Sequence, residues 1–333
     1  MSSLRLPAEW EPIRAVLLAW PHDGTDWEFM LEEVLECYRN MVRAIAPHAP
    51  VYVVAPQGVP VDIDVDRIYR IPTDDTWIRD YGPVSLTDAS GKLVPLDFQF
   101  NAWGLKFGAA NDNRVNSALA AQGLLPGLIN HRDFVLEGGS IESDGNGTIL
   151  TTAHCLTAPN RNDVLSLPQI EQRLKDSLAA SRILMLSHGH LTGDDTDGHI
   201  DTLARFLPGD TIAYVHCDDP EHPDFESLRL MEEELQDLCT ASGQPYRLVA
   251  LPTPATVPDP ADGHILPASY ANFLIVNGAV ILPVYGQSDA DAQAVAALSA
   301  AMPDYAMETV DCRALIRQHG SLHCATMQLP KAN

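Results

Sequence analysis

The spacing of apolar residues in the first part of the chain predicts four elements, in the order strand, helix, strand, strand. A short continuous apolar run at residues 15–20 indicates a buried strand. Thr25 and Glu28 have capping-box spacing at the start of a segment with helical periodicity. That helix is predicted to end near Pro47, before strands at 51–55 and 67–71. Its apolar face consists of Met30, Val34, Cys37, Met41 and Ile45.

Three pairs of short apolar runs, each separated by turn residues, predict β-hairpins. The dipeptide Asn277-Gly278 is the strongest of these signals, because both residues accept the positive φ angles of a type I′ turn. The other two turns are centred on Ser90-Gly91 and on residues 144–147. The predicted strand pairs are 83–86 with 93–98, 134–142 with 148–152, and 273–276 with 279–282.

Helical periodicity returns between the hairpins, which predicts an α/β protein of repeated hairpin and helix units. No low-complexity linker divides the chain, so we expect one domain over residues 1–333. Residues 251–267 contain five prolines and are interpreted as an irregular surface loop. The predicted helices begin near Pro168, span 225–238, and span 290–301 with Ser288 and Asp291 as caps and Pro303 as the stop.

Composition and charge limit the kinds of molecule that the protein is expected to bind. With 46% hydrophobic residues among 333, the chain can bury a large core. A formal net charge of −24 disfavours nucleic acid and anionic membrane surfaces as partners and favours a cationic substrate. The sequence predicts neither a signal peptide nor a membrane-spanning segment.

Cysteine usage indicates reduced thiols and therefore a cytoplasmic location. The six cysteines form no C-x-x-C pair, which disfavours a disulfide framework and a zinc site. They stand at positions 37, 155, 217, 239, 312 and 324.

The stretch from Thr192 to Asp201 crowds four carboxylates and one imidazole into ten residues, so it cannot belong to the core. One interpretation is a polar site floor in which His199 acts as an acid or base and Asp201 projects to the same side of an extended chain. The other is a solvated acidic turn. A calcium-binding EF-hand is excluded, because placing Gly198 at its sixth position leaves Ala204 where the last ligand is needed.

Three further polar clusters stand beside predicted strands. The segment 73–83 contains an Arg–Asp pair ending in Asp80, and loops at strand ends commonly carry sites. Glu137 is predicted to lie inside a hairpin strand, where the two glycines after it allow either close backbone approach or a bulge beside a solvated carboxylate. Cys324 follows a Gly-Ser turn, which favours an accessible thiol over a small buried hydrophobe.

Together these residues make a complete set of reagents for attack on a guanidinium carbon. A thiol needs a base or a nearby cation to form a thiolate at neutral pH, and His199 or a bound cation would meet that need for Cys324. Glu137 could orient the imidazole, as the third group of a triad does. Asp80 and Asp201 match the geometry with which carboxylates hold a guanidinium.

Eight spaced sequence blocks between residues 7 and 330 resemble the agmatine deiminases and related bacterial enzymes of peptidylarginine-deiminase type. So many blocks in one order are highly specific for that family. They are Pro7-Ala-Glu-Trp-Glu-Pro12, Trp20-Pro21, Asp74-Asp-Thr-Trp-Ile-Arg-Asp80, Phe100-Asn-Ala-Trp-Gly104, Leu136-Glu-Gly-Gly-Ser140, Asp195-Thr-Asp-Gly-His-Ile-Asp201, Leu266-Pro-Ala-Ser-Tyr270 and Leu322-His-Cys-Ala-Thr-Met-Gln328.

The resemblance implies a pentein fold, a five-bladed α/β-propeller with pseudo-fivefold symmetry and a central active site. It also implies hydrolysis of a guanidine to a urea and ammonia without metal or cofactor. Cys324 then resembles the nucleophile that forms an amidino-cysteine intermediate, and His199 the group that protonates ammonia and activates water. Glu137 resembles the partner of His199, and Asp80 and Asp201 the guanidinium-binding pair.

Agmatine is the expected substrate, hydrolysed to N-carbamoylputrescine as in putrescine and polyamine biosynthesis. Agmatine is a dication, whereas the carboxylate of arginine would lose solvent beside Asp195 without a partner. Trp77 and Trp103 are candidates for lining the alkyl chain. The chain departs from the family at Asp197, where Asn is commoner, and at residues 320–322, where glycines are usual, so substrate choice is less secure than the chemistry.

Alternatives from other classes remain open at this point. Peptidylarginine is an alternative substrate for the same chemistry. A metal-dependent hydrolase could use His188, His190 and His199 with the surrounding aspartates. A non-catalytic module that binds small cations would also suit the net charge. A homodimer is retained as a hypothesis.

Overall fold

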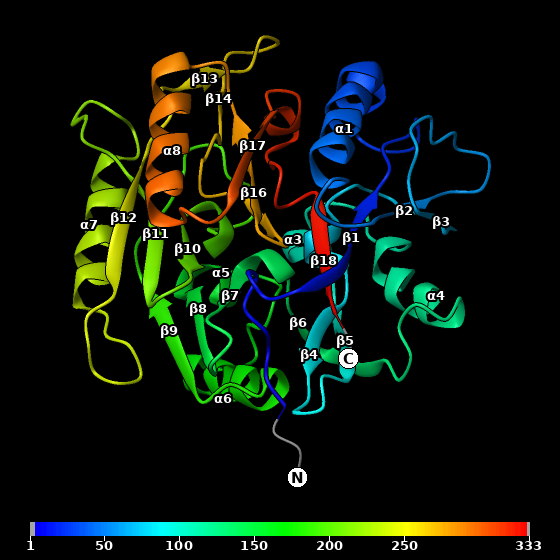
Figure 1. Ribbon diagram of the computed structural model, residues 1–333, viewed down its shortest axis with the longest axis horizontal. Coiled ribbons are helices and arrows are strands. Elements are labelled where there is room, and N and C mark those ends of the chain that lie inside the picture. The colour runs from blue at the N-terminus through cyan, green and yellow to red at the C-terminus, as the bar shows by residue number, and fades with distance from the viewer. Residues whose placement is uncertain (1–3, 332–333) are drawn as a thin grey trace.

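Five small sheets of one topology make up most of the computed structural model, which describes residues 4–331 (Figure 1). In each, the first strand pairs antiparallel with the second, and the third lies parallel to the second. The strands in this order are β4 Val84–Thr87, β5 Leu93–Gln99 and β6 Ile129–Val135; β7 Ile141–Ser143, β8 Thr148–Thr152 and β9 Arg182–Leu186; β10 Ala204–Leu207, β11 Thr211–His216 and β12 Arg247–Pro252; β15 Leu274–Val276, β16 Ala279–Val284 and β17 Ala306–Asp311; and β18 Thr326–Pro330, β1 Ile13–Ala19 and β2 Val51–Ala55.

One of these sheets joins the two ends of the chain. Strand β18 pairs with β1 in a register that sets Leu17 opposite Met327, and β3 (Arg67–Arg70) extends the same sheet beyond β2. A loop just before β18 is thereby held against residues at the start of the chain. The long separation in sequence makes this pairing invisible to local pattern analysis.

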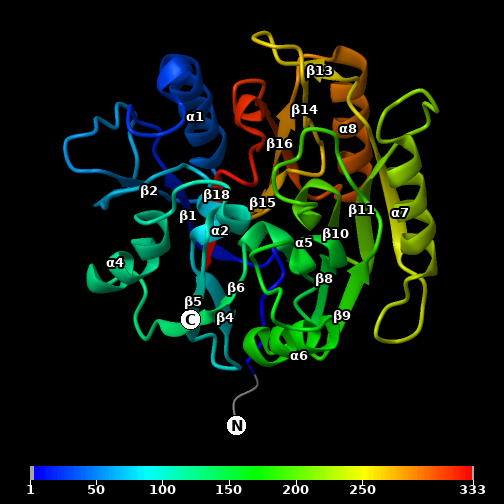
Figure 2. The same cartoon turned by 180° about the vertical axis from the view of Figure 1, so that it is seen from behind.

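A helix connects the second and third strands of every one of these sheets, as parallel pairing requires. These helices lie toward the periphery in both views, with the strands between them (Figures 1 and 2). In α1, the apolar residues Val34, Met41 and Ile45 are fully buried. The five helices are α1 Leu31–Ile45, α4 Val115–Ala121, α6 Leu167–Leu178, α7 Phe225–Asp237 and α8 Ser288–Ala301.

Short helical turns and one small hairpin complete the described elements. Among residues 4–331, none of the helices is both long and apolar enough to cross a bilayer. The α-helical turns are α2 Ile78–Tyr81, α3 Ala102–Leu105 and α5 Ala153–Thr157; the 3₁₀ turns are η1 Glu28–Met30, η2 Asp112–Arg114, η3 Gly138–Ser140, η4 Ile200–Thr202 and η5 Leu315–Gln318; the hairpin is β13 Val257–Pro258 with β14 Ile265–Leu266.

Each sheet is preceded by a short segment that leads into its first strand, and we call it the entry segment of that sheet. Turn α2 precedes β4, η3 precedes β7 and η4 precedes β10, while residues 268–273 and 320–325 precede β15 and β18. Turn α2 contacts both η3 and β18, and η3 contacts η4. Equivalent entry segments of different sheets therefore meet, and the polar residues they carry are brought together.

Most local predictions agree with the structure. The hairpins β4–β5 and β15–β16 form as expected, and the φ angles of Asn277 (41°) and Gly278 (86°) are those of a type I′ turn. Helices α6, α7 and α8 lie where periodicity placed them. Residues 251–267 are largely irregular, apart from the end of β12 and the β13–β14 hairpin.

Two predictions at element ends are wrong. The hydroxyl of Thr25 donates to the carbonyl of His22, so no capping box forms with Glu28, and α1 begins only at Leu31 after a 3₁₀ turn. Ser288 is the first residue of α8 rather than its cap. Asp291 does assist this helix start, because its carboxylate accepts the backbone N–H of Gln287.

The predicted strand 134–142 is also wrong, and the difference matters for the site. Strand β6 ends at Val135, residues 138–140 form the turn η3, and a new strand begins at Ile141. The chain thereby leaves one sheet and enters the next, because β6 pairs with β5 and β7 pairs with β8. Glu137 therefore lies in the connection between two sheets and not within a hairpin strand.

Replacing Asn277 should destabilise the protein. Its side chain accepts the N–H of Ile13 (2.9 Å) and donates to the carbonyls of Ile13 and His48 (3.1 Å each). At about 1 kcal/mol per hydrogen bond, with strain for Ala at positive φ, Asn277→Ala should lose about 3 kcal/mol in urea unfolding. Asn277→Gly keeps the backbone angle available and should lose less. Equal stability of Asn277→Ala and wild type would contradict this role.

Candidate active site

The entry segments of four sheets bring all five predicted catalytic residues to one buried place. Asp80 comes from α2, Glu137 stands just before η3, and His199 and Asp201 come from the start of η4. Cys324 lies before β18. Each is at most 4% exposed. The chain at 199–201 is a 3₁₀ turn and not the extended segment that we expected, yet both side chains reach the site.

Gly139 is the point around which three of these side chains converge. Its N–H donates to Asp80 Oδ1 (2.9 Å). A Cβ at this position would stand 2.6 Å from His199 Nδ1, 2.9 Å from Asp80 Oδ1 and 3.0 Å from Asp201 Oδ2. Only glycine fits here without moving these polar atoms, which is the close backbone approach that the paired glycines suggested.

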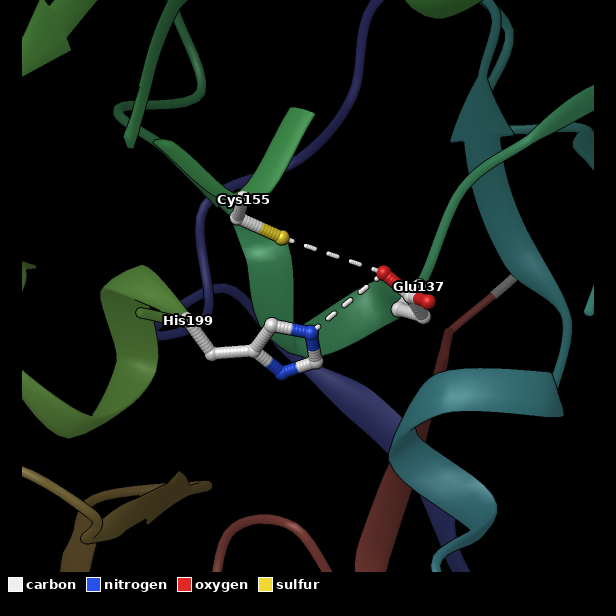
Figure 3. A group of neighbouring side chains, drawn as sticks. All are labelled: Glu137, Cys155 and His199. Carbon is white, nitrogen blue, oxygen red and sulfur yellow. Dashed lines mark hydrogen bonds and ion pairs between the residues drawn. The ribbon is translucent and has the colours of Figure 1, made fainter. Parts of the chain in front are cut away.

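His199 is held on one side by an anionic partner (Figure 3). Its Nε2 lies 3.4 Å from Glu137 Oε2. Burial by itself lowers the pKa of His199, but the charge of Asp80 and contacts with Cys155 and Glu137 raise this pKa well above its usual value. Burial likewise opposes ionisation of Glu137, yet His199 and Arg161 keep its pKa below normal. The pair is therefore imidazolium and carboxylate at neutral pH.

Arg161 and Cys155 complete the surroundings of Glu137, and sequence reasoning missed both. Arg161 Nε lies 3.0 Å from each oxygen of Glu137, and its Nη1 lies 2.6 Å from Asp197. The Cys155 thiol lies 3.9 Å from Glu137 Oε2 (Figure 3). Because a guanidinium already engages both carboxylate oxygens, a metal ion among Glu137, Cys155 and His199 would meet a neighbouring positive charge.

The other arrangement proposed for a metal does not assemble. Over residues 4–331, the groups of side chains that could hold an ion include neither His188 nor His190. His188 pairs instead with Glu234 near the surface. The histidines of the metal-hydrolase alternative therefore do not gather around His199.

Cys324 lies between a carboxylate and an amide. Its Sγ is 3.7 Å from Asp201 Oδ2 and accepts a hydrogen bond from Asn272 Nδ2 at 3.2 Å. Asn272 Oδ1 in turn accepts the backbone N–H groups of His323 (2.9 Å) and Cys324 (3.2 Å). Burial, together with the charges of Asp201 and Asp80, raises the pKa of Cys324 well above its usual value. The free protein therefore holds a neutral thiol here.

The two aspartates differ in charge environment. Burial raises the pKa of Asp80, an effect that the nearby His199 reduces, and Trp103 Nε1 donates to Asp80 Oδ2 at 2.9 Å. Burial would also raise the pKa of Asp201, but the hydrogen bond from His323 outweighs it, so this pKa lies below normal. Trp103 has a φ of 54° inside α3, and this strained backbone places its indole against Asp80.

Two buried polar atoms at the site have no hydrogen-bond partner. They are His199 Nδ1 and Asp201 Oδ1. Buried polar atoms are normally paired, and an unpaired one costs about 1–3 kcal/mol. Asp201 Oδ1 is an acceptor that a ligand N–H group could satisfy, whereas Nδ1 of the His199 imidazolium is a donor that faces Asp80 Oδ1 at 3.6 Å.

A small cavity of about 30 Å³ is lined by Cys324 and Asp80, whereas His199 and Asp201 lie behind its lining. That volume holds about one water molecule, so a larger ligand requires the rim to open. Cys324 lines it and Cys155 does not, which distinguishes the two thiols near His199. The lining includes the predicted residue Asp80 and the predicted tail contacts Trp77, Trp103 and Asp195. The remaining lining residues were not predicted, and they are Asp26, Asp75, Phe107, Thr196, Gln318, His319 and Gly320.

The rim of the cavity is acidic. Asp195 is partly exposed and lies 3.6 Å from His319 Nε2. Asp75 is partly buried, and loss of solvent around its carboxyl together with the neighbouring carboxylates Asp26 and Asp74 raises its pKa to about 7. Trp77 packs against Trp27, with ring centroids 5.8 Å apart.

Sequence reasoning missed several further residues of the site, and a positional signal could have found one of them. Asn272 directly precedes the predicted strand 273–276, just as Asp80 stands a few residues before the strand at 83–86. The others become visible only through contacts between distant segments. They are Glu9, Cys155, Arg161 and His323.

Known proteins of similar sequence and structure share this arrangement of elements. A family model described as Porphyromonas-type peptidyl-arginine deiminase matches residues 5–330. Agmatine deiminase of Pseudomonas aeruginosa (strain LESB58) is 33% identical over 355 aligned residues, covering 98% of this chain and 95% of that one. A cysteine-to-serine variant of C. jejuni agmatine deiminase with substrate bound superposes with a TM-score of 0.93 at 38% identity, covering 99% and 97%.

More distant structures agree on the fold. Agmatine deiminase of Enterococcus faecalis has a TM-score of 0.91 at 30% identity, covering 99% of this chain and 96% of that one. A dimethylarginine dimethylaminohydrolase has a TM-score of 0.54 at 13% identity, covering 95% and 100%. The fold and these relatives define the class, a pentein hydrolase that acts on carbon–nitrogen bonds of guanidino groups. The chain belongs to the agmatine deiminase family, within the Porphyromonas-type peptidyl-arginine deiminases.

The raised pKa of Cys324 predicts the pH dependence of its alkylation. Only the thiolate reacts, so the rate with iodoacetamide should still be rising at pH 9. Asp201→Asn removes a negative charge beside the sulfur, lowers the thiol pKa and should shift the profile to lower pH. Mass spectrometry of the Cys324 peptide measures this, with the Cys239 peptide as internal reference. A shift to higher pH in Asp201→Asn would contradict the assignment.

Proposed function

We propose that the protein is an agmatine deiminase that hydrolyses agmatine to N-carbamoylputrescine and ammonia. One observation carries the proposal: the buried Cys324 thiol lies 3.7 Å from Asp201, whose other oxygen, Oδ1, is buried without a hydrogen-bond partner. A guanidinium offers N–H donors for that oxygen and the positive charge that Asp80 and Asp201 favour. Relatives named agmatine deiminase over nearly the whole chain support the same reaction.

In the first chemical step, Cys324 would lose its thiol proton to water as the cation binds and then attack the guanidinium carbon. The sulfur takes a proton back when the urea product leaves in the second step. Asp80 and Asp201 hold the planar cation while the carbon–sulfur bond forms. His199, an imidazolium before the reaction, donates a proton to the departing nitrogen, which leaves as ammonia. The product of this step is an amidino group bound to the sulfur of Cys324, with His199 neutral.

The second step would be hydrolysis of that intermediate. His199 takes a proton from water as the oxygen attacks the amidino carbon, and the carbon–sulfur bond then breaks. The released product is a urea, and Cys324 returns to its starting state. Glu137 stabilises the imidazolium that re-forms, as its position beside Nε2 supports.

The neutral thiol of the free protein suggests that substrate itself activates the nucleophile. Asp80 and Asp201 raise the pKa of Cys324, and a guanidinium between them would offset both charges. The thiolate would then form mainly when a cation is bound. This is the alternative in which a bound cation, and not His199, promotes thiolate formation.

The acidic rim supports a second positive charge on the substrate. Asp26, Asp75 and Asp195 line the outer part of the cavity, where the ammonium of agmatine would lie after the alkyl chain passes Trp77 and Trp103. A free arginine would place its carboxylate among these acids. A cation near Asp75 would also favour its ionised form, since its pKa is about 7.

We further propose that the five sheets form a five-bladed propeller around this site, as one catalytic domain over residues 1–333. The shared strand order of the five sheets supports it. So does the origin of the site residues, because Asp80, Glu137, His199, Asn272 and Cys324 each come from the entry segment of a different sheet.

Cys324→Ala should abolish ammonia release from agmatine, because the covalent route disappears with the sulfur. Activity should fall below about one percent of wild type in an assay of ammonia and N-carbamoylputrescine. Chelator treatment of the wild type is the control for the metal alternative and should leave the rate unchanged. Turnover above that level in the variant would contradict the proposal, and unchanged turnover would favour a site that does not use this thiol.

Agmatine should be preferred over free arginine and over an arginyl peptide. An unmatched buried charge can discriminate by roughly 10⁴ in kcat/KM, and the arginine carboxylate would be such a charge. Ammonia release with the three compounds at equal concentration measures the preference. Efficient turnover of internal peptidyl-arginine would replace this proposal with the peptidylarginine alternative.

A further inference from the structure

A chain of buried polar groups continues from Asp201 away from the cavity. His323 Nδ1 lies 2.7 Å from Asp201 Oδ2, and His323 Nε2 lies 2.8 Å from Glu9 Oε2. All three side chains are at most 7% exposed. His323 precedes the cavity-lining Cys324 in sequence, yet it does not line the cavity itself.

The contacts of His323 fix the role of its Nδ1. The Asp201 carboxylate can only accept, so Nδ1 donates its hydrogen to Asp201 Oδ2. On the other side of the ring, Arg205 Nη2 lies 3.0 Å from His323 Nε2 and 2.9 Å from Glu9 Oε2. Arg205 and the His323 ring therefore both meet the same oxygen of Glu9.

Glu9 is fixed from several directions. Its Oε1 accepts the backbone N–H of Ile275 (2.7 Å), and its Oε2 accepts from Gln328 Nε2 (2.9 Å). Burial opposes the charge of Glu9, but Arg205 and His323 hold its pKa well below normal, so it is a carboxylate. An anion held this firmly leaves the imidazole of His323 little freedom to turn.

Arg205 connects Glu9 to another buried carboxylate. It pairs with both Glu9 and Glu142. Glu142 therefore belongs to the same buried network without contacting Asp201.

We propose that His323 is the positioning residue of Asp201, and that Glu9 holds the His323 ring in its orientation. The ring occupies Oδ2 of Asp201 and thereby turns the unpaired Oδ1 toward the bound cation. Without this contact, Asp201 would rotate or take up a proton and would lose its hold on a planar cation. The role rests on the proposed function only in treating that cation as a guanidinium or amidinium group.

Two alkylating probes test the role without relying on turnover. Chloroacetamidine is a planar cation and chloroacetamide its neutral isostere, and both transfer a carbon to Cys324 with loss of chloride. The ratio of their rates at the Cys324 peptide, by mass spectrometry, reports recognition of the cation, because the reactivity of the thiolate affects both. Asp201→Asn sets the ratio expected when recognition is lost.

Substitution of His323 by Asn or by Gln tests the two nitrogens of its ring one at a time. The nitrogen of Asn lies near the place of Nδ1 and that of Gln near Nε2, so His323→Asn can still donate to Asp201 and His323→Gln cannot. We expect His323→Gln to lower the ratio roughly ten- to a hundredfold, to the level of Asp201→Asn, and His323→Asn to lower it less. Equal ratios in the two variants, whether high or low, would overturn the proposal.

Two substitutions in the same buried network supply matched controls. Glu9→Gln removes the charge that holds His323 and should lower the ratio in the same direction. Glu142→Gln removes an equally buried partner of Arg205 that makes no hydrogen bond to His323 or Asp201, so its ratio should equal that of wild type even if its unfolding midpoint falls. A fall in Glu142→Gln as large as in Glu9→Gln would overturn the specific role.

The outcomes remain distinct from those of the proposed function. If wild type prefers the cationic probe but releases no ammonia from agmatine, the proposed substrate is wrong and the test of His323 still stands. If the His323 variants do not fold, as circular dichroism would show, Glu9→Gln decides: a wild-type ratio in that variant overturns the proposal.

Discussion

The burial of ionised carboxylates at one place is the constraint on which the rest of this structure depends. A carboxylate removed from water costs several kcal/mol unless a cation and hydrogen bonds replace its hydration. Here Arg161 pairs with Glu137, and His323 pairs with Asp201. Arg205 pairs with both Glu9 and Glu142. Removing one member of such a pair would leave its partner charged and alone, so the whole network must form together.

These ion pairs leave the part of the site around Cys324 without a matching positive charge. The charges of both Asp80 and Asp201 act on the Cys324 thiol, and Asp201 Oδ1 has no hydrogen-bond partner. A positive ligand would therefore complete the charge balance as well as the hydrogen bonds. The same missing charge keeps the thiol neutral and unreactive in the free protein.

Pairing of the two ends of the chain connects the buried ion pairs with the part of the site around Cys324. Pairing of β1 with β18 sets the beginning of the chain beside its end, so Glu9 can reach His323 across more than three hundred residues. Asn277 ties the neighbouring hairpin to β1. The loop that carries Cys324 is thus held by strand pairing on one side and by a buried ion network on the other.

The sequence by itself determined most of the local elements and was enough to select the reactive groups that we propose. Turn chemistry at Asn277-Gly278 and helical periodicity in α6, α7 and α8 depend on neighbours a few residues away, so they could be predicted. Cys324, His199, Glu137, Asp80 and Asp201 were recognised from motif blocks, and their roles as proposed rest on that resemblance together with their position in one buried site.

Only the tertiary structure decided how those groups are supported. The break in the strand at 134–142 follows from β6 pairing with β5 and β7 pairing with β8, and no local pattern records such a change of sheet. Arg161, Asn272, His323 and Glu9 were missed because their contacts join residues from 24 to 314 positions apart. Charge state and hydrogen bonding in a buried site depend on distances of a few ångströms, and a folded chain sets those distances only after its sheets have assembled.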